Sequence, residues 1–315
     1  MIVLFVLLAI LLGVLVGSYA AYRKTFYQDR RIKEDIYRLP KHTDQEIAAR
    51  THALIAAFDA REFESVEIRS HDGLRLFARY YHAFDGAPLH IQFHGYRSYA
   101  MRDFCGGNPL AVECGHNTLV VDQRAHGRSE GHTISFGVKE RLDCLAWVEY
   151  ATRRFGRDVP IFLSGVSMGA STVLMATALP LPKNVVGVIA DCPYSSPRRI
   201  IQKVMRDMGL PVFIYPLVAL GGFLYGGIRG LSRYTAEDAV RFAKVPILLI
   251  HGDADGFVPC DMSHAIAKAC ASRICFEVFP DADHAQSYMS DYDRYRRISH
   301  EFIKECLNDY QNKED

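Results

Sequence analysis

The chain has 315 residues, of which 49% are hydrophobic and 23% charged, so it can bury a sizeable core, and its length suits one large α/β domain better than two small ones. The 37 Lys and Arg residues nearly balance the 36 Asp and Glu residues, and the formal net charge of +1 argues against nucleic acid as a partner. The 8 cysteines are scattered, without a C-x-x-C pair or a tight His/Cys cluster. We therefore expect free thiols in a reducing cytoplasm rather than a zinc or redox site.

The first predicted element is the uncharged run of residues 2–21, which is rich in Leu, Ile and Val and long enough to cross a bilayer as a helix. We expect residues 1–22 to form a transmembrane anchor. The alternative is a cleaved signal peptide, because Ser18-Tyr19-Ala20 resembles a cleavage site, but no basic residue precedes the apolar run. The positive-inside rule then predicts a cytoplasmic domain from the basic residues that follow the run. These are Arg23, Lys24, Arg30, Arg31 and Lys33.

Residues 23–62 are predicted to form a juxtamembrane linker and a helix. Thr43 and Glu46 match a capping box that opens this helix, which we expect to end near Phe58. Two strands follow at residues 65–69 and 74–82, joined by a turn with an Asp72-Gly73 signal. This hairpin predicts an antiparallel start to the sheet.

From residue 89 onward, apolar runs of strand length alternate with helix-length segments, which is typical of a mainly parallel sheet covered by helices on both faces. We expect residues 63–310 to form this domain. The expected strands are 89–93, 118–122, 161–164, 185–190, 247–251 and 275–279, and the expected helices are 102–113, 138–154, 168–179, 261–271 and 293–308. Because ligands of such sheets bind beyond the carboxyl ends of the strands, the loops after the strands are the candidates for chemistry.

One of these loops has the pattern of a nucleophile elbow. An apolar run from residue 161 leads into Gly165-Val166-Ser167-Met168-Gly169, and small helix-compatible residues follow. In such an elbow the serine lies at the apex of a strained strand-to-helix turn, and the flanking glycines allow the strand and helix to cross closely. The pattern predicts Ser167 as a nucleophile.

A serine hydroxyl needs a neighbouring base, usually a histidine that a buried carboxylate orients. His284 lies on a loop after a predicted strand, whereas His264 and His300 fall within predicted helices. Asp253 and Asp255 compete as the acid, and we favour Asp255 because the Gly-Phe-Val-Pro that follows it is suited to enclosing a buried side chain. The alternative for His284 is a solvated surface side chain. The attacked carbonyl also needs hydrogen-bond donors for its developing negative charge, and we expect the backbone N–H groups of Tyr96 and Met168 to supply them.

With these residues in place, the chain resembles the α/β-hydrolase superfamily of serine hydrolases, in particular bacterial membrane-anchored members grouped with serine aminopeptidases and acyl esterases. The resemblance covers about residues 65–308 and implies an eight-stranded type of sheet with Ser167 as nucleophile, Asp255 as acid and His284 as base. The motifs that carry it are His94-Gly95-Tyr96, Asp122-x-Arg124-x-His126-Gly127-x-Ser129, Gly165-x-Ser167-x-Gly169, His251-Gly252-x-x-Asp255-x-x-Val258-Pro259 and His284.

Two positions depart from the family pattern. Ala125 replaces the glycine that is common after the arginine, and His284 follows Asp-Ala-Asp rather than a glycine. Neither Ala125 nor the residue before His284 carries a reacting atom. Relatives with an aspartate nucleophile, such as epoxide hydrolases and haloalkane dehalogenases, are disfavoured because the elbow carries Ser167.

An apolar insertion at about residues 195–240 separates two of the expected strands, and its residues 209–228 carry no charge. A second membrane span there would place Ser167 and His284 on opposite sides of the bilayer, so we interpret the insertion as a helical lid. We expect Phe213, Leu217 and Phe223 to be the substrate-binding residues of this lid, either lining an acyl pocket or inserting into the nearby bilayer. The alternative is an ordinary buried helical hairpin.

These features predict a membrane-anchored serine hydrolase that cleaves an ester or thioester through an acyl-enzyme, acting on a small-molecule acyl substrate, with lipid-derived molecules among the candidates. A serine peptidase of the aminopeptidase type is the second interpretation, and a catalytically silent binding module with a hydrolase fold is the third. The sequence has no nucleotide-phosphate loop, metal cluster or dinucleotide fingerprint, so we expect no cofactor.

Overall fold

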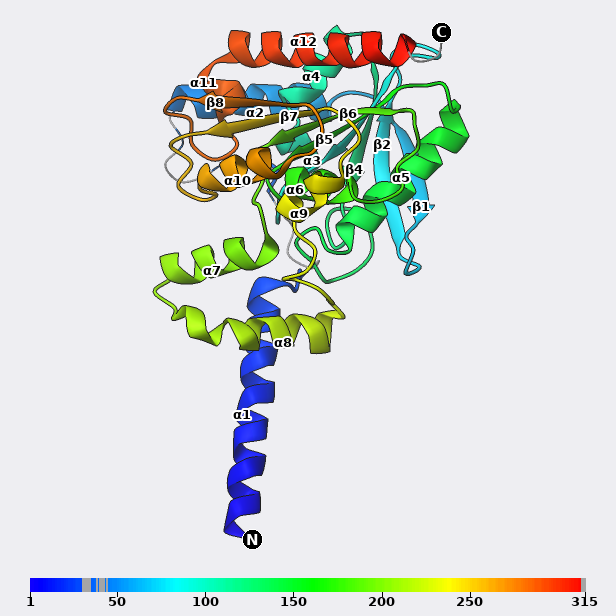
Figure 1. Cartoon of the computed structure of the whole chain (residues 1–315). Coiled ribbons are helices and arrows are strands. Elements are labelled where there is room, and N and C mark those ends of the chain that lie inside the picture. Colours follow the sequence, from blue (N-terminus) through cyan, green and yellow to red (C-terminus); the bar gives the residue numbers. More distant parts are fainter. Residues whose placement is uncertain (30–34, 38, 40–42, 44, 313–315) are drawn as a thin grey trace.

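The computed structural model describes residues 1–29, 35–37, 39, 43 and 45–312 of the chain, and it centres on one eight-stranded sheet (Figure 1). The strand order is β1-β2-β4-β3-β5-β6-β7-β8. β1 pairs antiparallel with β2 and β2 antiparallel with β4, whereas all later pairs are parallel. The expected antiparallel start and parallel continuation are confirmed. The strands are β1 Glu64–Arg69, β2 Arg75–Tyr81, β3 Leu89–Phe93, β4 Asn117–Asp122, β5 Ile161–Val166, β6 Val185–Asp191, β7 Ile247–Gly252 and β8 Ile274–Phe279.

Helices cover both faces of the sheet (Figure 1). The larger core lies on the side of α5 and α6, where Trp147 is fully buried, and a second core lies on the side of α12, around Phe162 and Phe302. The strands between these layers are almost wholly buried, which is why they read as continuous apolar runs in the sequence. The helices are α1 Ile2–Thr25, α2 Gln45–Asp59, α3 Ala100–Asp103, α4 Gly107–Glu113, α5 Glu140–Phe155, α6 Met168–Ala176, α7 Pro197–Asp207, α8 Tyr215–Gly226, α9 Ala236–Ala239, α10 Asp261–Ala269, α11 Ser287–Ser290 and α12 Tyr292–Gln311.

The expected helix at residues 102–113 is interrupted in the structure, where α3 and α4 are separate. The break falls at Gly106, which lies against the ring of Tyr288: a Cβ at this position would lie 2.5 Å from a ring carbon. Close packing against a residue far along the chain therefore requires glycine here, and local sequence does not reveal that requirement.

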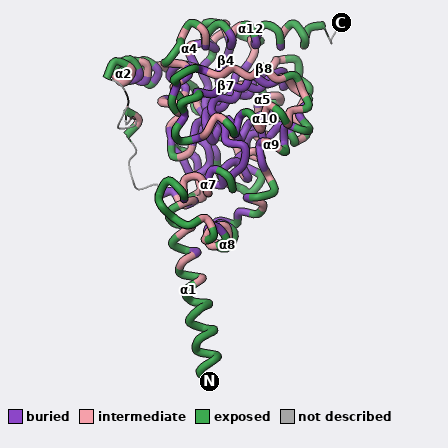
Figure 2. Tube along the Cα trace, turned by 60° about the vertical axis from the view of Figure 1, so that its left-hand side comes forward, coloured by how far each residue is buried: buried purple, intermediate pink, exposed green. Residues whose placement is uncertain are grey.

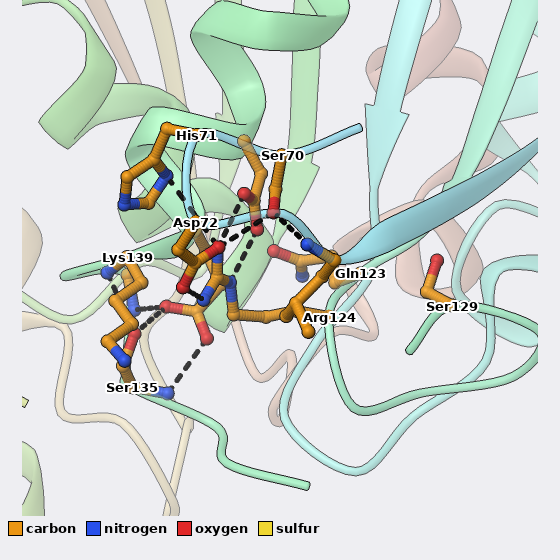
Figure 3. Close-up of polar contacts among 12 residues, drawn as sticks. Ser70, His71, Asp72, Gln123, Arg124, Ser129, Ser135 and Lys139 are labelled. Atoms are coloured by element: carbon orange, nitrogen blue, oxygen red, sulfur yellow. Dashed lines mark hydrogen bonds and ion pairs between the residues drawn. The ribbon is translucent and has the colours of Figure 1, made fainter. Parts of the chain in front are cut away.

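A buried ion-pair network ties the first hairpin to the loop after β4 (Figure 3). The Arg124 side chain is only 2% exposed and donates to both carboxylate oxygens of Asp143 at 2.6 Å and to Asp72 at 3.0 and 3.1 Å. Asp72 belongs to the turn between β1 and β2, and Asp143 belongs to α5. These bonds hold the turn between β1 and β2, the loop after β4 and α5 together.

Among the described residues, α1 is the one helix that is long and apolar enough to cross a membrane. Its first half protrudes from the domain, as Figures 1 and 2 show, whereas Ser18 and Tyr22 are buried against α8. The chain after α1 enters the domain core, because Phe26 is fully buried and its carbonyl accepts a hydrogen bond from the N–H of Ile134. Of the basic residues used to predict the side of the membrane, Arg30, Arg31 and Lys33 lie outside the described residues.

The insertion after β6 contains the amphipathic helix α7 and the apolar helix α8. Helix α8 lies across α1 below the sheet (Figure 1) and packs on α1 rather than closing over the carboxyl ends of the strands. Three glycines of α8 make the close approach possible: a Cβ on Gly221 would lie 2.2 Å from the Ser18 carbonyl oxygen, and Gly222 and Gly226 similarly face Phe26 and Tyr22. In this structure the insertion therefore packs against the C-terminal part of α1.

Candidate active site

Ser167 lies at the apex of a sharp turn between β5 and α6. Its φ of 54° and ψ of −114° fall outside the regions that a serine normally adopts. A Cβ on Gly165 would lie 2.3 Å from the backbone of Gly169, and a Cβ on Gly169 would lie 1.8 Å from the Phe93 carbonyl oxygen. Both glycines are therefore sterically required for the strand and helix to cross, as the elbow pattern predicts.

The structure brings Ser167, His284 and Asp255 together in one hydrogen-bonded chain. The His284 Nε2 atom lies 2.9 Å from Ser167 Oγ, and His284 Nδ1 lies 2.6 Å from Asp255 Oδ2. Because the carboxylate is the acceptor at Nδ1, that nitrogen carries the proton, and Nε2 is left to accept the proton of the serine hydroxyl. The Asp255 side chain is completely buried, whereas that of His284 is 21% exposed and faces the site. This geometry suits a nucleophile, a base and an orienting acid.

Asp255 is held as an ionised acceptor by four donors. Its Oδ1 accepts the backbone N–H groups of Phe257 and Val258, at 2.9 and 2.7 Å, and its Oδ2 faces His284 and His251. Burial alone would raise the pKa of Asp255, but the hydrogen bonds from His251 and His284 outweigh burial and hold the pKa well below its usual range. The competing candidate, Asp253, instead accepts the N–H of Asp281 at 2.7 Å and so closes the neighbouring turn.

His251 is a site residue that the sequence analysis did not assign. Its Nε2 lies 2.9 Å from the Val258 carbonyl oxygen and 3.2 Å from Asp255 Oδ2, while its Nδ1 lies 2.6 Å from Ser263 Oγ. The carbonyl acceptor places the proton on Nε2, so this N–H also faces Asp255 Oδ2, the oxygen that His284 Nδ1 contacts. The signal in the sequence was the His-Gly-x-x-Asp spacing at the end of the strand.

The residues expected to supply oxyanion donors lie beside Ser167. A Cβ on Gly95 would lie 3.4 Å from Ser167 Cβ, so the chain leading to Tyr96 passes directly against the nucleophile. Within the described part of the chain, neither the N–H of Tyr96 nor that of Met168 donates to another protein group. Both groups are thus available for a ligand oxygen.

Two buried histidines shape the loop that carries Tyr96. The Nε2 of His94 accepts the N–H of Gln123 at 3.1 Å, and the Nε2 of His126 accepts the N–H of Arg97 at 3.0 Å. Burial lowers the pKa of both rings, that of His126 to about 3. They therefore remain neutral acceptors, as these bonds require.

Asp191 is a second buried carboxyl group beside the site that the sequence analysis missed. It ends β6, its backbone oxygen accepts the N–H of Ser167 at 2.8 Å, and its Oδ2 accepts the Tyr295 hydroxyl at 3.2 Å. Its Oδ1 has no hydrogen-bond partner in the described part of the chain. Burial raises the pKa of Asp191 to about 6. A buried carboxyl group at the end of an apolar strand has no local motif, which explains why it was missed.

A cavity of about 530 Å³ opens at Ser167 and His284 and extends between the sheet and helices α4 and α12. Phe213, Leu217 and Phe223 are not among its lining residues, which corrects the expectation that the insertion lines the pocket. The insertion lies elsewhere because its glycines pack against α1. Residues of α2, α4, α11 and α12 form the walls instead, including Ile47, Thr51, Leu110, Tyr288 and Ile303.

The donor atoms nearest the site do not form a good metal centre. Asp255, His284 and Cys192 are close enough to share an ion, but the first two are bonded to each other and burial raises the pKa of Cys192 well above its usual value. A protonated buried thiol is a poor ligand.

Residues 91–213 match the family described as serine aminopeptidase, S33. Among curated proteins, the chain is 27% identical over 206 residues to the uncharacterized protein YqkD of Bacillus subtilis, covering 64% of this chain and 66% of YqkD. It is 26% identical over 200 residues to the uncharacterized protein YfhR of Salmonella typhimurium, covering 61% of this chain and 63% of YfhR. The matches thus span slightly less than two thirds of these relatives.

Solved structures share the whole fold. The esterase Pf2001 of Pyrococcus furiosus superposes with a TM-score of 0.63 at 22% identity, covering 89% of this chain and 98% of the esterase. Est1E of Butyrivibrio proteoclasticus, solved with ferulic acid, gives a TM-score of 0.59 at 23% identity, covering 77% and 99%. The chain is therefore an α/β hydrolase by fold, with its residues 91–213 matching the serine aminopeptidase S33 family.

Proposed function

We propose that this protein is a membrane-anchored serine hydrolase that cleaves a carboxylic ester or thioester through an acyl-enzyme on Ser167. The single observation that carries the proposal is the hydrogen-bonded chain from Ser167 through His284 to the buried Asp255. The strained elbow adds to it, as do the N–H groups of Tyr96 and Met168, which donate to no other group among the described residues.

The proposed reaction follows from this geometry. His284 Nε2 takes the proton of Ser167 Oγ as the oxygen attacks the substrate carbonyl carbon. The N–H groups of Tyr96 and Met168 donate to the resulting oxyanion, and each such donor is worth about 3 to 4 kcal/mol in the transition state. His284 then protonates the leaving alcohol or thiol. A water molecule, deprotonated by the same ring, releases the acid from Ser167.

The cavity supports an acyl substrate of moderate size. Its walls carry many aliphatic and aromatic side chains, including Phe104, Leu110, Ile189, Tyr288 and Ile303. Small-molecule sites are commonly of this size and character. The esterases that share the fold agree with this assignment.

Labelling by a fluorophosphonate probe tests the proposal. The wild-type protein should be labelled, and Ser167→Ala should not be. Ser171→Ala is the matched control, because Ser171 lies one helical turn further along α6 and its hydroxyl bonds the Tyr194 carbonyl oxygen rather than His284. Folded wild-type protein that the probe never labels would contradict the proposal.

An aminopeptidase-like activity is the second candidate, since the matched family is described as serine aminopeptidase and the Asp191 carboxyl group lies in the cavity wall. A carboxylate there is suited to a substrate amine. Comparing p-nitrophenyl esters of different acyl length with aminoacyl-naphthylamides separates the two activities.

We also propose that α1 anchors the protein in a bilayer, with the domain on the cytoplasmic side. The apolar length of α1 and the placement of Arg23 and Lys24 at its end support it. Protease added to intact cells should leave the domain intact. Digestion of the domain by this protease would contradict the cytoplasmic orientation.

A further inference from the structure

Helix α8 and the turn that precedes it expose an apolar surface. Phe213 is 82% exposed, Phe223 48% and Leu224 45%, and residues 209–228 contain no charged side chain. A helix on a water-facing surface normally carries polar residues on its outer side. An exposed apolar patch of this kind marks a contact with another apolar phase or partner.

The position of α8 along α1 indicates what this apolar surface contacts. The hydroxyl of Tyr225 donates to the Leu15 carbonyl oxygen at 3.1 Å, and Gly221 packs on Ser18. Helix α8 therefore crosses α1 within the apolar run that ends at Ala21, before the first charges at Arg23 and Lys24. Figures 1 and 2 show that α8 lies across the axis of α1 at this level.

The length of α1 sets the depth of this crossing. Residues 2–17 rise about 24 Å at about 1.5 Å per residue, which is less than the roughly 30 Å of a bilayer's hydrocarbon core. An α1 that spans the bilayer must therefore carry the region around Ser18, and α8 with it, into the boundary between hydrocarbon and headgroups. The exposed Arg229, just after α8, lies near Phe223, with its guanidinium carbon 5.9 Å from the ring centroid. It supplies a cation suited to lipid phosphates at that depth.

We propose that α8 and the turn before it, with Phe213, Phe223 and Leu224 exposed, lie in the interface of the lipid bilayer as a second membrane contact beside α1. This inference rests on the proposed anchoring by α1. It gives the domain a fixed height above the membrane, which a single helix on a free linker would not provide.

Brominated lipids test the depth of α8 in the full-length protein reconstituted into lipid nanodiscs. The chain has one tryptophan, Trp147, which is fully buried in the domain core and gives a constant background. Four variants each add a tryptophan: Phe223→Trp and Phe213→Trp in the proposed contact, Leu8→Trp in α1, and Phe84→Trp near the amino-terminal end of β4. Phe84 is 65% exposed and serves as the matched aqueous control.

We expect lipids brominated near the headgroup end of the acyl chain to quench the emission of Phe223→Trp and Phe213→Trp, and the emission of Phe84→Trp to be unaffected. Quenching of Leu8→Trp alone would overturn the α8 contact while leaving the anchor intact. Absence of quenching in Leu8→Trp by lipids brominated near the middle of the acyl chain would overturn both the anchor and the contact. Thermal unfolding checks that each variant is folded, and the two contact positions provide independent readings.

A second inference comes from hydrogen bonds between the end of α1 and the loop of residues 94–98, called here the oxyanion loop. The Tyr96 hydroxyl donates to the Thr25 carbonyl oxygen at 2.8 Å, and Arg97 Nη2 donates to those of Lys24 and Tyr27 at 3.1 and 2.9 Å. The last carbonyl groups of a helix lack intrahelical partners, and a cation there is also favoured by the helix dipole. The oxyanion loop thus caps α1.

The same loop is strained and held from its other side. Arg97 has a φ of 49°, which a side chain with a Cβ rarely adopts, and its N–H donates to His126 Nε2 at 3.0 Å. The Tyr96 ring stacks on Phe136, which in turn packs on Phe26 just after α1. Bonds from the membrane helix and from the β4 loop together fix the peptide that carries the Tyr96 N–H.

We infer that the side chains of Tyr96 and Arg97 are positioning residues, through which the end of α1 sets the oxyanion donor of the proposed reaction. The anchor is then part of the catalytic structure and does more than fix its location. Catalysis is sensitive to small displacements of such a donor, so losing these bonds lowers kcat.

Kinetics of the full-length protein test this inference. We expect Tyr96→Phe, which keeps the ring, and Arg97→Ala to lower kcat for ester hydrolysis about tenfold with little change in KM. Arg97→Lys, which retains a donor, should restore part of kcat. Tyr225→Phe is the matched control, because it removes a similar bond to α1 away from the oxyanion loop and should retain the wild-type kcat.

Wild-type kcat in both Tyr96→Phe and Arg97→Ala would overturn the inference, as would an equal loss in Tyr225→Phe. A wild-type protein without esterase activity or probe labelling would instead contradict the proposed function. If Arg97→Ala fails to fold, Tyr96→Phe decides.

Discussion

The carboxyl edge of the sheet and the unit formed by α1 and α8 distribute polarity in opposite ways. At the carboxyl edge, Asp255 and His251 are completely buried and bonded to one another. In the α1–α8 unit, by contrast, Phe213 and much of α1 are exposed although they are apolar. Asp255 and His251 are stable in the interior because each has hydrogen-bond partners, whereas the exposed apolar side chains of the α1–α8 unit are not covered by the described part of the chain.

The two regions therefore differ in what stabilises them. The polar groups of the first are bonded within the protein, and the apolar groups of the second need a contact outside the chain. At the carboxyl edge, the protein itself holds Ser167, His284 and Asp255 in place by hydrogen bonds. The α1–α8 unit exposes apolar side chains that the proposed bilayer would cover. Substitutions in the first region should therefore alter the rate and pH dependence of the proposed reaction, and those in the second should alter the proposed contact with the membrane.

The largest effect is expected from Ser167→Ala, which removes the nucleophile and should lower kcat for ester hydrolysis by about 10⁶-fold. Stopped assays with a p-nitrophenyl ester measure the loss. Thermal unfolding should change little, because the rest of the hydrogen-bonded chain remains. Residual activity within a factor of about ten of wild type would place catalysis elsewhere.

Asp255→Asn is expected to lower kcat by about 10⁴-fold, because an amide no longer stabilises the correct tautomer and charge of His284. Asp253→Asn is the matched control two residues away, since the Asp253 side chain accepts the N–H of Asp281 and, among the described residues, forms no bond with His284. Comparable losses in the two variants would contradict the assignment of Asp255.

Arg124→Met should lower the free energy of unfolding by about 3 to 5 kcal/mol, because it leaves Asp143 buried without its cation. Urea unfolding measures the change. The folded fraction should retain most of its kcat, since Arg124 contacts no reacting atom. A loss of kcat without a loss of stability would show that this network belongs to catalysis instead.

Asp191 and Asp255 should affect stability with opposite dependence on pH. Because the pKa of Asp191 is raised to about 6, the native state retains a proton that the unfolded chain releases near pH 4. Its contribution is therefore greatest below about pH 4 and falls as the pH rises to about 6, by at most about 3 kcal/mol. The lowered pKa of Asp255 gives a contribution that is present above about pH 4 and lost below it.

Unfolding of wild type and Asp191→Asn between pH 4 and 7 measures this effect. The variant should gain stability relative to wild type as the pH rises, because it has no buried charge to form. A difference between the two proteins that is independent of pH would show that Asp191 does not titrate in this range.

Particular residues show which parts of the fold and of the candidate site could be predicted from the sequence. The lengths of the continuous apolar runs predicted the strands β3, β4, β5 and β7, because these strands are buried on both faces. Ser167 and His284 were recognisable because an elbow and a strand-end loop are local patterns. The break at Gly106 and the position of Asp191 were not, since each depends on a neighbour remote in the sequence, Tyr288 for Gly106 and Tyr295 for Asp191.

The sequence by itself determined the α/β architecture, the apolar length of α1 and the chain order of Ser167, Asp255 and His284, because hydrophobic period and turn chemistry are written in consecutive residues. Only the tertiary structure decided that α8 packs on α1 instead of covering the cavity, and that the end of α1 bonds to the oxyanion loop. The physical reason is that an apolar glycine-rich helix fits several apolar surfaces equally well by composition. Close approach at Gly221 and the carbonyl groups left free at the end of α1 select one of them.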